Sequence, residues 1–160
     1  MTSPTPTPSL KSTPAPLGAA AVERLRAALA AEHAAIFAYG RMGVLLDANG
    51  KQEARAAEVM HRARRDTLVL KLDEAKGSPA PAEPGYALPF PVTDGASALR
   101  LAVHVEDGVA ANWRAVLKTV EGEQRKAALE AYSDAAIRAT RWRRLAGVTP
   151  ATTPFPGRPQ

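Results

Sequence analysis

Apolar residues recur with the period of an α-helix over four long stretches of the chain. In the first stretch one face carries, at every third or fourth position, Val22, Leu25, Leu29, Glu32, Ile36, Tyr39, Gly43 and Leu46. This spacing is typical of a buried helix face, and Glu32 interrupts its apolar character. A carboxylate there costs roughly several kcal/mol unless it is hydrogen-bonded, paired with a cation, bound to a metal or protonated. The surroundings of Glu32 are therefore the first candidate site.

The remaining periodic stretches, with their glycine and asparagine stop signals, predict three further helices. The stop signals are Asn49-Gly50, Gly77, Glu121-Gly122 and Gly147. They divide the helical part of the chain into residues 19–47, 51–76, 94–120 and 123–145. Asp94 is a plausible N-cap of the third helix. The sequence thus predicts an all-α protein.

A proline-rich segment separates the second helix from the third. Residues 78–93 contain five prolines and no helical period. About 16 extended residues reach at most ~55 Å, whereas a helix of about 27 residues is ~40 Å long. The segment can therefore run the length of a bundle. This favours an antiparallel four-helix bundle with one long proline-rich crossover between helices 2 and 3.

The two ends of the chain differ in composition from the helical region. Residues 1–18 are rich in Pro and Thr and are expected to form a disordered tail, and residues 148–160 form a second Pro-rich tail. Residues 19–147 make up one domain. No apolar run approaches the roughly 20 residues that span a bilayer, and residues 1–18 lack the apolar centre of a signal peptide. These absences predict a cytoplasmic protein without a membrane partner.

The third predicted helix, like the first, has a glutamate on its apolar face. Glu32 and Tyr39 align with Glu106 and Trp113, 74 residues further along (32 to 106 and 39 to 113). Glu106 again stands on an apolar face. Two equivalent glutamates in two helical hairpins predict one shared central site.

Counting depth from each interhelical turn predicts the partners of the two glutamates. With Asn49 as the turn, the level of Glu32 on the second helix is about residue 66, and the arginine nearest to it is Arg65. The level of Glu106 on the fourth helix is about residue 137, beside Arg138. Arginine meets a carboxylate with a planar, permanently charged fork. We therefore predict two buried pairs, Glu32 with Arg65 and Glu106 with Arg138, and no cofactor.

A metal site is the alternative interpretation of the same residues. Dinuclear sites in helical bundles use one Glu from each of two helices and a Glu-x-x-His from each of the other two. The second helix contains Glu58 and His61 at that spacing, whereas the fourth has no histidine. A partial set for iron or manganese would comprise Glu32, Glu58, His61, Glu106 and Asp134. A hydrogen-bonded core histidine is the competing interpretation of His61.

Four runs of residues together resemble one known family. They are Ala30-Ala-Glu-His-Ala-Ala-Ile-Phe-Ala-Tyr-Gly40, His61-Arg-Ala-Arg-Arg-Asp66, Tyr86-Ala-Leu-Pro89 and Arg138-Ala-Thr-Arg-Trp-Arg143. Over residues 19–147 the sequence resembles DUF4439, an actinobacterial ferritin-like family of unknown function. The resemblance implies a ferritin-like four-helix bundle, and ferritin-like relatives often bind two irons for oxidase or storage chemistry. Glu32 and Glu106 match the lone glutamates of that pattern, Glu58 and His61 match it loosely, and the second Glu-x-x-His is absent.

Three functions are consistent with these features. The first is a non-enzymatic bundle with a degenerate metal site, acting through a partner or as a homodimer joined by its small-residue faces. The second is a metal-dependent oxidoreductase, and the third is a small-molecule binder whose arginines hold an anionic group. The net charge of +5 allows an anionic partner. Nucleic-acid binding is not expected, because Trp142 alone lies among the basic runs.

Overall fold

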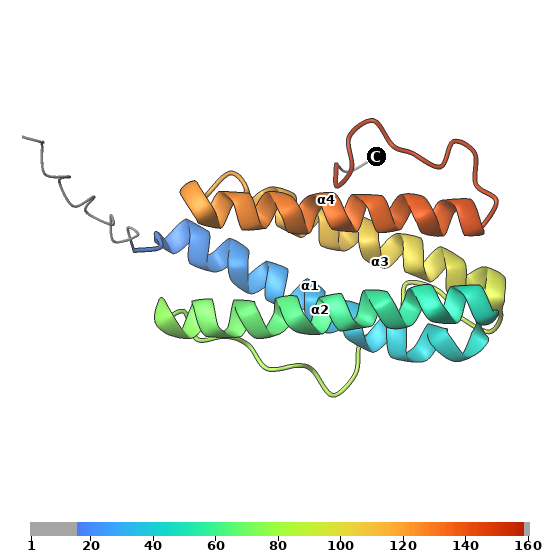
Figure 1. Cartoon of the computed structure of the whole chain (residues 1–160). Helices are drawn as coiled ribbons and strands as arrows, with labels where there is room; N and C mark the ends of the chain where they lie inside the picture. The colour runs from blue at the N-terminus through green and yellow to red at the C-terminus, as the bar shows by residue number, and fades with distance from the viewer. Residues whose placement is uncertain (1–15, 159–160) are drawn as a thin grey trace, which may run out of the picture.

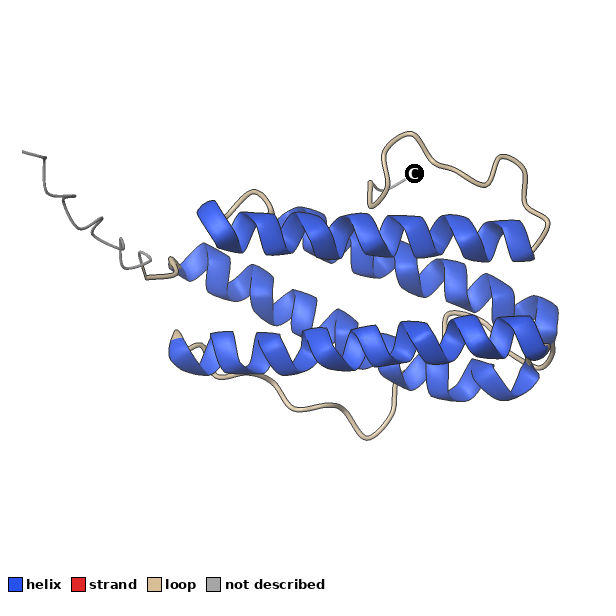
Figure 2. Cartoon of the chain, in the orientation of Figure 1, coloured by secondary structure: helices blue, strands red, loops and turns tan. Residues whose placement is uncertain are grey.

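Four α-helices form the body of the protein. The computed structural model describes residues 16–158. The helices are α1 (Ala19–Met42), α2 (Ala48–Glu74), α3 (Gly95–Val116) and α4 (Gly122–Leu145), with a short 3-10 turn, η1 (Gly43–Leu45), after α1. The described residues contain helices and loops and no strand (Figure 2). The predicted all-α four-helix bundle is confirmed.

The helices form two antiparallel hairpins joined by a long crossover. In Figure 1, α1 and α2 run in opposite directions, as do α3 and α4, whereas α2 and α3 run in the same direction. The connection between α2 and α3 passes along the outside of the bundle and allows this parallel arrangement (Figure 1). α1 packs against both α2 and α3, and α3 also packs against α4. The long crossover is therefore present as predicted.

Side-chain caps fix where two of the helices begin. At α3, Asp94 Oδ1 accepts a hydrogen bond from the Ser97 N–H at 2.8 Å, and Ser97 Oγ accepts one from the Asp94 N–H at 3.1 Å. At α2, Asp47 Oδ1 accepts from the Gly50 N–H at 2.7 Å. The prediction that residues 49 and 50 form the interhelical turn is wrong, since both lie in the first turn of α2. The turn is centred earlier, at η1 and Leu46.

Two apolar clusters fill the two ends of the bundle. One is built around residues such as Leu29, Leu68 and Trp113, and the other around Tyr39 and Trp142. On α2 and α3 the fully buried His61 and Glu106 lie between the residues of one cluster and those of the other. On α1 the fully buried Glu32 lies between Leu29 and Ala35 of the first cluster, and the residues of the second cluster begin at Ala38. The polar layer therefore lies in the middle of the core.

The segments that flank the helices are described from residue 16 and up to residue 158. The predicted disordered tail falls almost entirely on residues 1–15, outside the described residues. The segment after α4 returns over that helix (Figure 1), where Tyr132 Oη donates to the Pro156 carbonyl at 3.2 Å. Gly157 approaches α3 so closely that a Cβ atom would lie 2.8 Å from the Ala111 backbone. Within residues 16–158, none of the helices has the apolar length that a bilayer crossing requires.

Candidate functional site

His61 joins the two buried glutamates. Its Nδ1 lies 2.6 Å from Glu32 Oε2 and its Nε2 lies 3.1 Å from Glu106 Oε1. The other oxygen of Glu32, Oε1, accepts a hydrogen bond from Trp113 Nε1 at 2.7 Å. One imidazole on α2 thus bridges carboxylates on α1 and α3, and both oxygens of Glu32 have a partner.

Glu106 accepts all of its hydrogen bonds from the described residues on a single oxygen. Oε1 receives Tyr39 Oη at 2.6 Å and Arg138 Nε at 2.8 Å, besides the contact with His61. Trp142 Nε1 donates in turn to Tyr39 Oη at 2.8 Å. A continuous hydrogen-bonded chain therefore runs from Trp142 on α4, through all four helices, to the indole that binds Glu32.

The network has a crossed internal symmetry. Tyr39 follows Glu32 by seven residues and Trp113 follows Glu106 by seven. Each aromatic donor bonds the glutamate of the other hairpin, Tyr39 to Glu106 and Trp113 to Glu32. Seven residues are about two helical turns, which places donor and glutamate on the same face of their own helix. The sequence repeat is therefore also a repeat of contacts, exchanged between α1 and α3.

The geometry sets the protonation state of His61. A neutral imidazole has one N–H and one acceptor nitrogen, whereas a carboxylate only accepts. Both ring nitrogens face carboxylate oxygens, so both bonds form only when His61 is doubly protonated. Burial alone would lower the pKa of His61, but the hydrogen bonds and negative charges of Glu106 and Glu32 raise it above its ordinary value. His61 is therefore the cation of the central layer.

Charge in the buried layer is balanced. Burial would raise the pKa of Glu106, but the His61 hydrogen bond and the charge of Arg138 hold that pKa below its ordinary value. Burial opposes the charge of Arg138 as well, yet Glu106 raises the pKa of this guanidinium. Burial and the nearby Glu106 carboxylate keep the pKa of Tyr39 well above its usual range, so its phenol remains a donor. Two carboxylates thus face two cations.

The raised pKa of His61 and the lowered pKa of Glu106 predict how the stability of the protein changes with pH. Because the folded pKa of His61 is raised, its contribution is complete below pH 6.5 and is lost as the pH rises through the folded pKa. Because the folded pKa of Glu106 is lowered, its contribution is complete above pH 4.5 and is lost as the pH falls through the folded pKa. Unfolding in urea should therefore show the largest contribution from these groups between pH 4.5 and 6.5.

A variant of the exposed His104, His104→Gln, is the matched control for that measurement. It should leave the pH curve unchanged, because His104 lies outside the central layer. A free energy of unfolding that stays constant as the pH rises above 6.5 would show that His61 gains no proton on folding.

One predicted Glu–Arg pair is present and the other is not. Arg138 contacts Glu106 as predicted, although with one bond and not with both arms of its fork. Arg65 instead bonds its neighbour Asp66 at the surface, with Nε 2.8 Å from Oδ1. The Glu32–Arg65 prediction is wrong because the turn lies about two to three residues before Asn49, which moves the facing residue by twice that number. His61 therefore occupies the level assigned to Arg65.

The predicted metal ligands are brought together only in part. Glu58 points to the surface and accepts from Arg62 Nη2 at 2.6 Å, and Asp134 pairs with Arg64 away from the layer. Both residues lie outside the site, so their inclusion in the ligand set is wrong. Among residues 16–158, no group of three or more His, Asp or Glu side chains is arranged to hold a metal ion. The residues present therefore do not fit a two-metal centre.

The sequence analysis missed the aromatic donors and the bridging role of His61. Two buried atoms of the charged pair, Glu106 Oε2 and Arg138 Nη2, have no hydrogen-bond partner among the described residues. The donors Tyr39, His61 and Arg138 all contact Oε1 of Glu106, and Arg138 does so through Nε, which leaves Oε2 and Nη2 without a partner. The available signal for the donors was the spacing of seven residues from each glutamate.

A comparison with protein families identifies the family of this chain. The family model described as a domain of unknown function, DUF4439, matches residues 24–160. The chain belongs to the DUF4439 family. This DUF4439 chain is similar to a conserved hypothetical protein, rv2844, from Mycobacterium tuberculosis, whose crystal structure is known. The two share 38% identity with a TM-score of 0.79, over 87% of this chain and 99% of that one. A comparison with proteins of curated function found no match.

Proposed function

We propose that this DUF4439 protein is a non-enzymatic binding protein, built on a ferritin-like bundle whose metal centre has been replaced by buried charged pairs. The observation that carries the proposal is the position of Arg138, whose Nε lies 2.8 Å from Glu106 Oε1. This carboxylate is the one that a central metal would need. A permanent guanidinium charge on it supplies the compensation that iron or manganese would supply, and it repels a further cation.

The state of His61 supports the same proposal. A metal-binding histidine offers an unprotonated nitrogen to the ion. Here both ring nitrogens point at carboxylates, at 2.6 Å from Glu32 and 3.1 Å from Glu106. A metal would have to remove a proton from His61 and break one of these two bonds. The alternative of an iron- or manganese-dependent oxidoreductase is therefore less consistent with the network.

Metal analysis tests the proposal. Protein purified without chelator, and the same protein after anaerobic incubation with Fe²⁺ or Mn²⁺, is measured by elemental analysis and thermal unfolding. We expect far less than one metal ion per chain and an unchanged Tm, because the network is already neutral.

The matched variant is Glu32→Gln, which removes one of the two central carboxylates. Metal that both proteins bind equally lies elsewhere on the surface and leaves the proposal intact. Stoichiometric iron or manganese that the wild type binds and Glu32→Gln loses would contradict the proposal and establish a metal centre.

Binding takes one of two forms in this proposal, self-association or a different partner. Light scattering in solution separates them. A mass of twice the 16.9 kDa of the chain identifies the homodimer, and the mass of a single chain excludes it and leaves the form that binds a different partner.

A further inference from the structure

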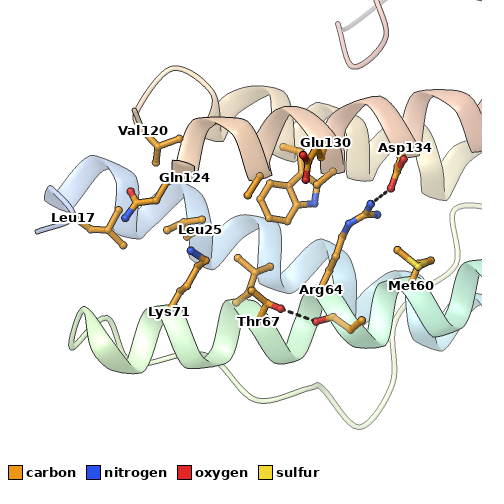
Figure 3. Close-up of a pocket in the computed structure, with 15 residues that line it drawn as sticks. Leu17, Leu25, Met60, Arg64, Thr67, Lys71, Val120, Gln124, Glu130 and Asp134 are labelled. Carbon is orange, nitrogen blue, oxygen red and sulfur yellow. Dashed lines mark hydrogen bonds and ion pairs between the residues drawn. The ribbon is translucent and has the colours of Figure 1, made fainter. Parts of the chain in front are cut away.

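A cleft opens along the bundle between α2 and α4. The backbones of these two helices lie further apart than those of the pairs α1 with α2 and α3 with α4. The cleft has a volume of about 290 Å³. This is close to the lower end of the volumes at which proteins bind small molecules, about 300–1,000 Å³. Figure 3 shows its lining side chains converging from both helices.

The floor of the cleft is apolar and buried. Leu25, Leu68, Trp113, Val120 and Ala131 line it, and each belongs to the larger apolar cluster of the core. These side chains offer dispersion contacts and no hydrogen-bond acceptor to an incoming molecule. The body of a ligand that fits this floor is therefore apolar.

One end of the cleft presents a cation with a free donor. Arg64 extends from α2 across the cleft and pairs through Nη2 with Asp134 on α4 (Figure 3). Its side chain is only 13% exposed. The other terminal nitrogen, Nη1, is buried and has no hydrogen-bond partner among the described residues. A buried guanidinium N–H without an acceptor is costly, and a ligand carboxylate would satisfy it with a charge-assisted bond.

We propose that this cleft binds a medium-chain aliphatic monocarboxylate. The carboxylate meets Nη1 after the Arg64 guanidinium turns towards the cleft, and the chain lies over Trp113 towards Val120 and Leu17. From Arg64 the lining residues of α2 continue to Lys71. That distance is about 10 Å along the helix, and the cleft continues to Leu17, which suits a linear chain better than a compact ring system. This inference deepens the proposed function, because it rests on the protein acting by binding.

The test is calorimetric titration of the full chain with decanoate and with decanol, which has the same chain length and no charge. We expect the wild type to bind decanoate at least about tenfold more tightly than decanol, because only the acid supplies the acceptor for Arg64. Arg64→Met should lose this preference and bind the two ligands equally. Lys71→Met, which removes the other cation of the cleft, should keep the preference.

A second pair of variants locates the apolar body. Ala127 is exposed and lines the cleft, whereas Ala56 is exposed on α2 outside it. Ala127→Trp should block both ligands, and Ala56→Trp should bind them as the wild type does. The fluorescence of Trp113 should change on binding to the wild type.

Two results would overturn the inference: absence of decanoate binding to the wild type, or an equal preference for decanoate in the wild type and Arg64→Met. Neither result would affect the metal analysis, so failure of this inference is distinguishable from failure of the proposed function. If the protein bound a metal at Glu32 and also preferred decanoate, the inference about the cleft would stand. The proposal that charged pairs have replaced the metal centre would then be wrong.

Discussion

Replacing Glu106 by alanine is expected to lower the free energy of unfolding by about 3–5 kcal/mol, since breaking a buried ion pair leaves an uncompensated charge. Glu106 is the only carboxylate that Arg138 contacts among the described residues, and its Oε1 also holds Tyr39 and His61. The variant leaves a guanidinium that is 11% exposed without the anion it is bonded to. Urea unfolding at pH 6, where both His61 and Glu106 contribute fully to stability, measures the loss.

Two variants separate charge from volume in that experiment. Glu106→Gln keeps nearly the same shape but not the charge, and it should lose most of the same free energy because Arg138 stays uncompensated. Glu58→Ala removes a partly exposed surface pair with Arg62 and should cost no more than about 1 kcal/mol. If Glu106→Gln were as stable as the wild type, the side chain of Glu106 would stabilise the fold through its packing alone. The ion pair with Arg138 would then make no net contribution to the free energy of unfolding.

The contrast between the two predicted ion pairs shows what sequence periodicity can determine. The pattern located both glutamates on buried faces, because the buried face of a helix follows from the spacing of apolar residues in that helix alone. The level of the partner depends on the turn between the helices. At the second hairpin α3 ends at Val116 and α4 begins at Gly122, so the turn again lies before the predicted Glu121-Gly122. The Arg138 side chain still reaches Glu106. At the other hairpin, Asp47 caps α2 before residue 49, and His61 took the place of Arg65.

The crossed aromatic donors lay beyond what periodicity alone could give. The repeat places Tyr39 and Trp113 on the same faces as Glu32 and Glu106, so the types of residue in the layer were visible. Which glutamate each donor reaches depends on how the two hairpins rotate and pack against each other. That rotation is set by side-chain packing between α1 and α3, two helices that are far apart in the sequence. The contacts between hairpins therefore had to come from the structure.

The second large effect is expected from His61→Leu, and it should depend on pH in a defined direction. The variant leaves Glu32 and Glu106 buried with Arg138 as the one remaining cation among their contacts. Near neutral pH an unpaired buried charge of this kind costs about 3–5 kcal/mol. As the pH falls, the folded variant can bind one proton between the two carboxylates, which restores neutrality. Since its folded state then binds more protons than its unfolded state, its stability should rise as the pH falls.

The expected slope is about 1.4 kcal/mol per pH unit for one whole proton. Between pH 6.5 and 4.5 the contributions of His61 and Glu106 to the wild type are constant, so the difference between variant and wild type should shrink across this window. Leu68→Ala is the matched control, because it removes a buried side chain from the same helix at a cost of about 2–5 kcal/mol without changing the charge. Its difference from the wild type should not vary with pH. A pH-independent difference for His61→Leu as well would mean that His61 fills the core as a neutral ring, and the charge balance proposed for the central layer would not hold.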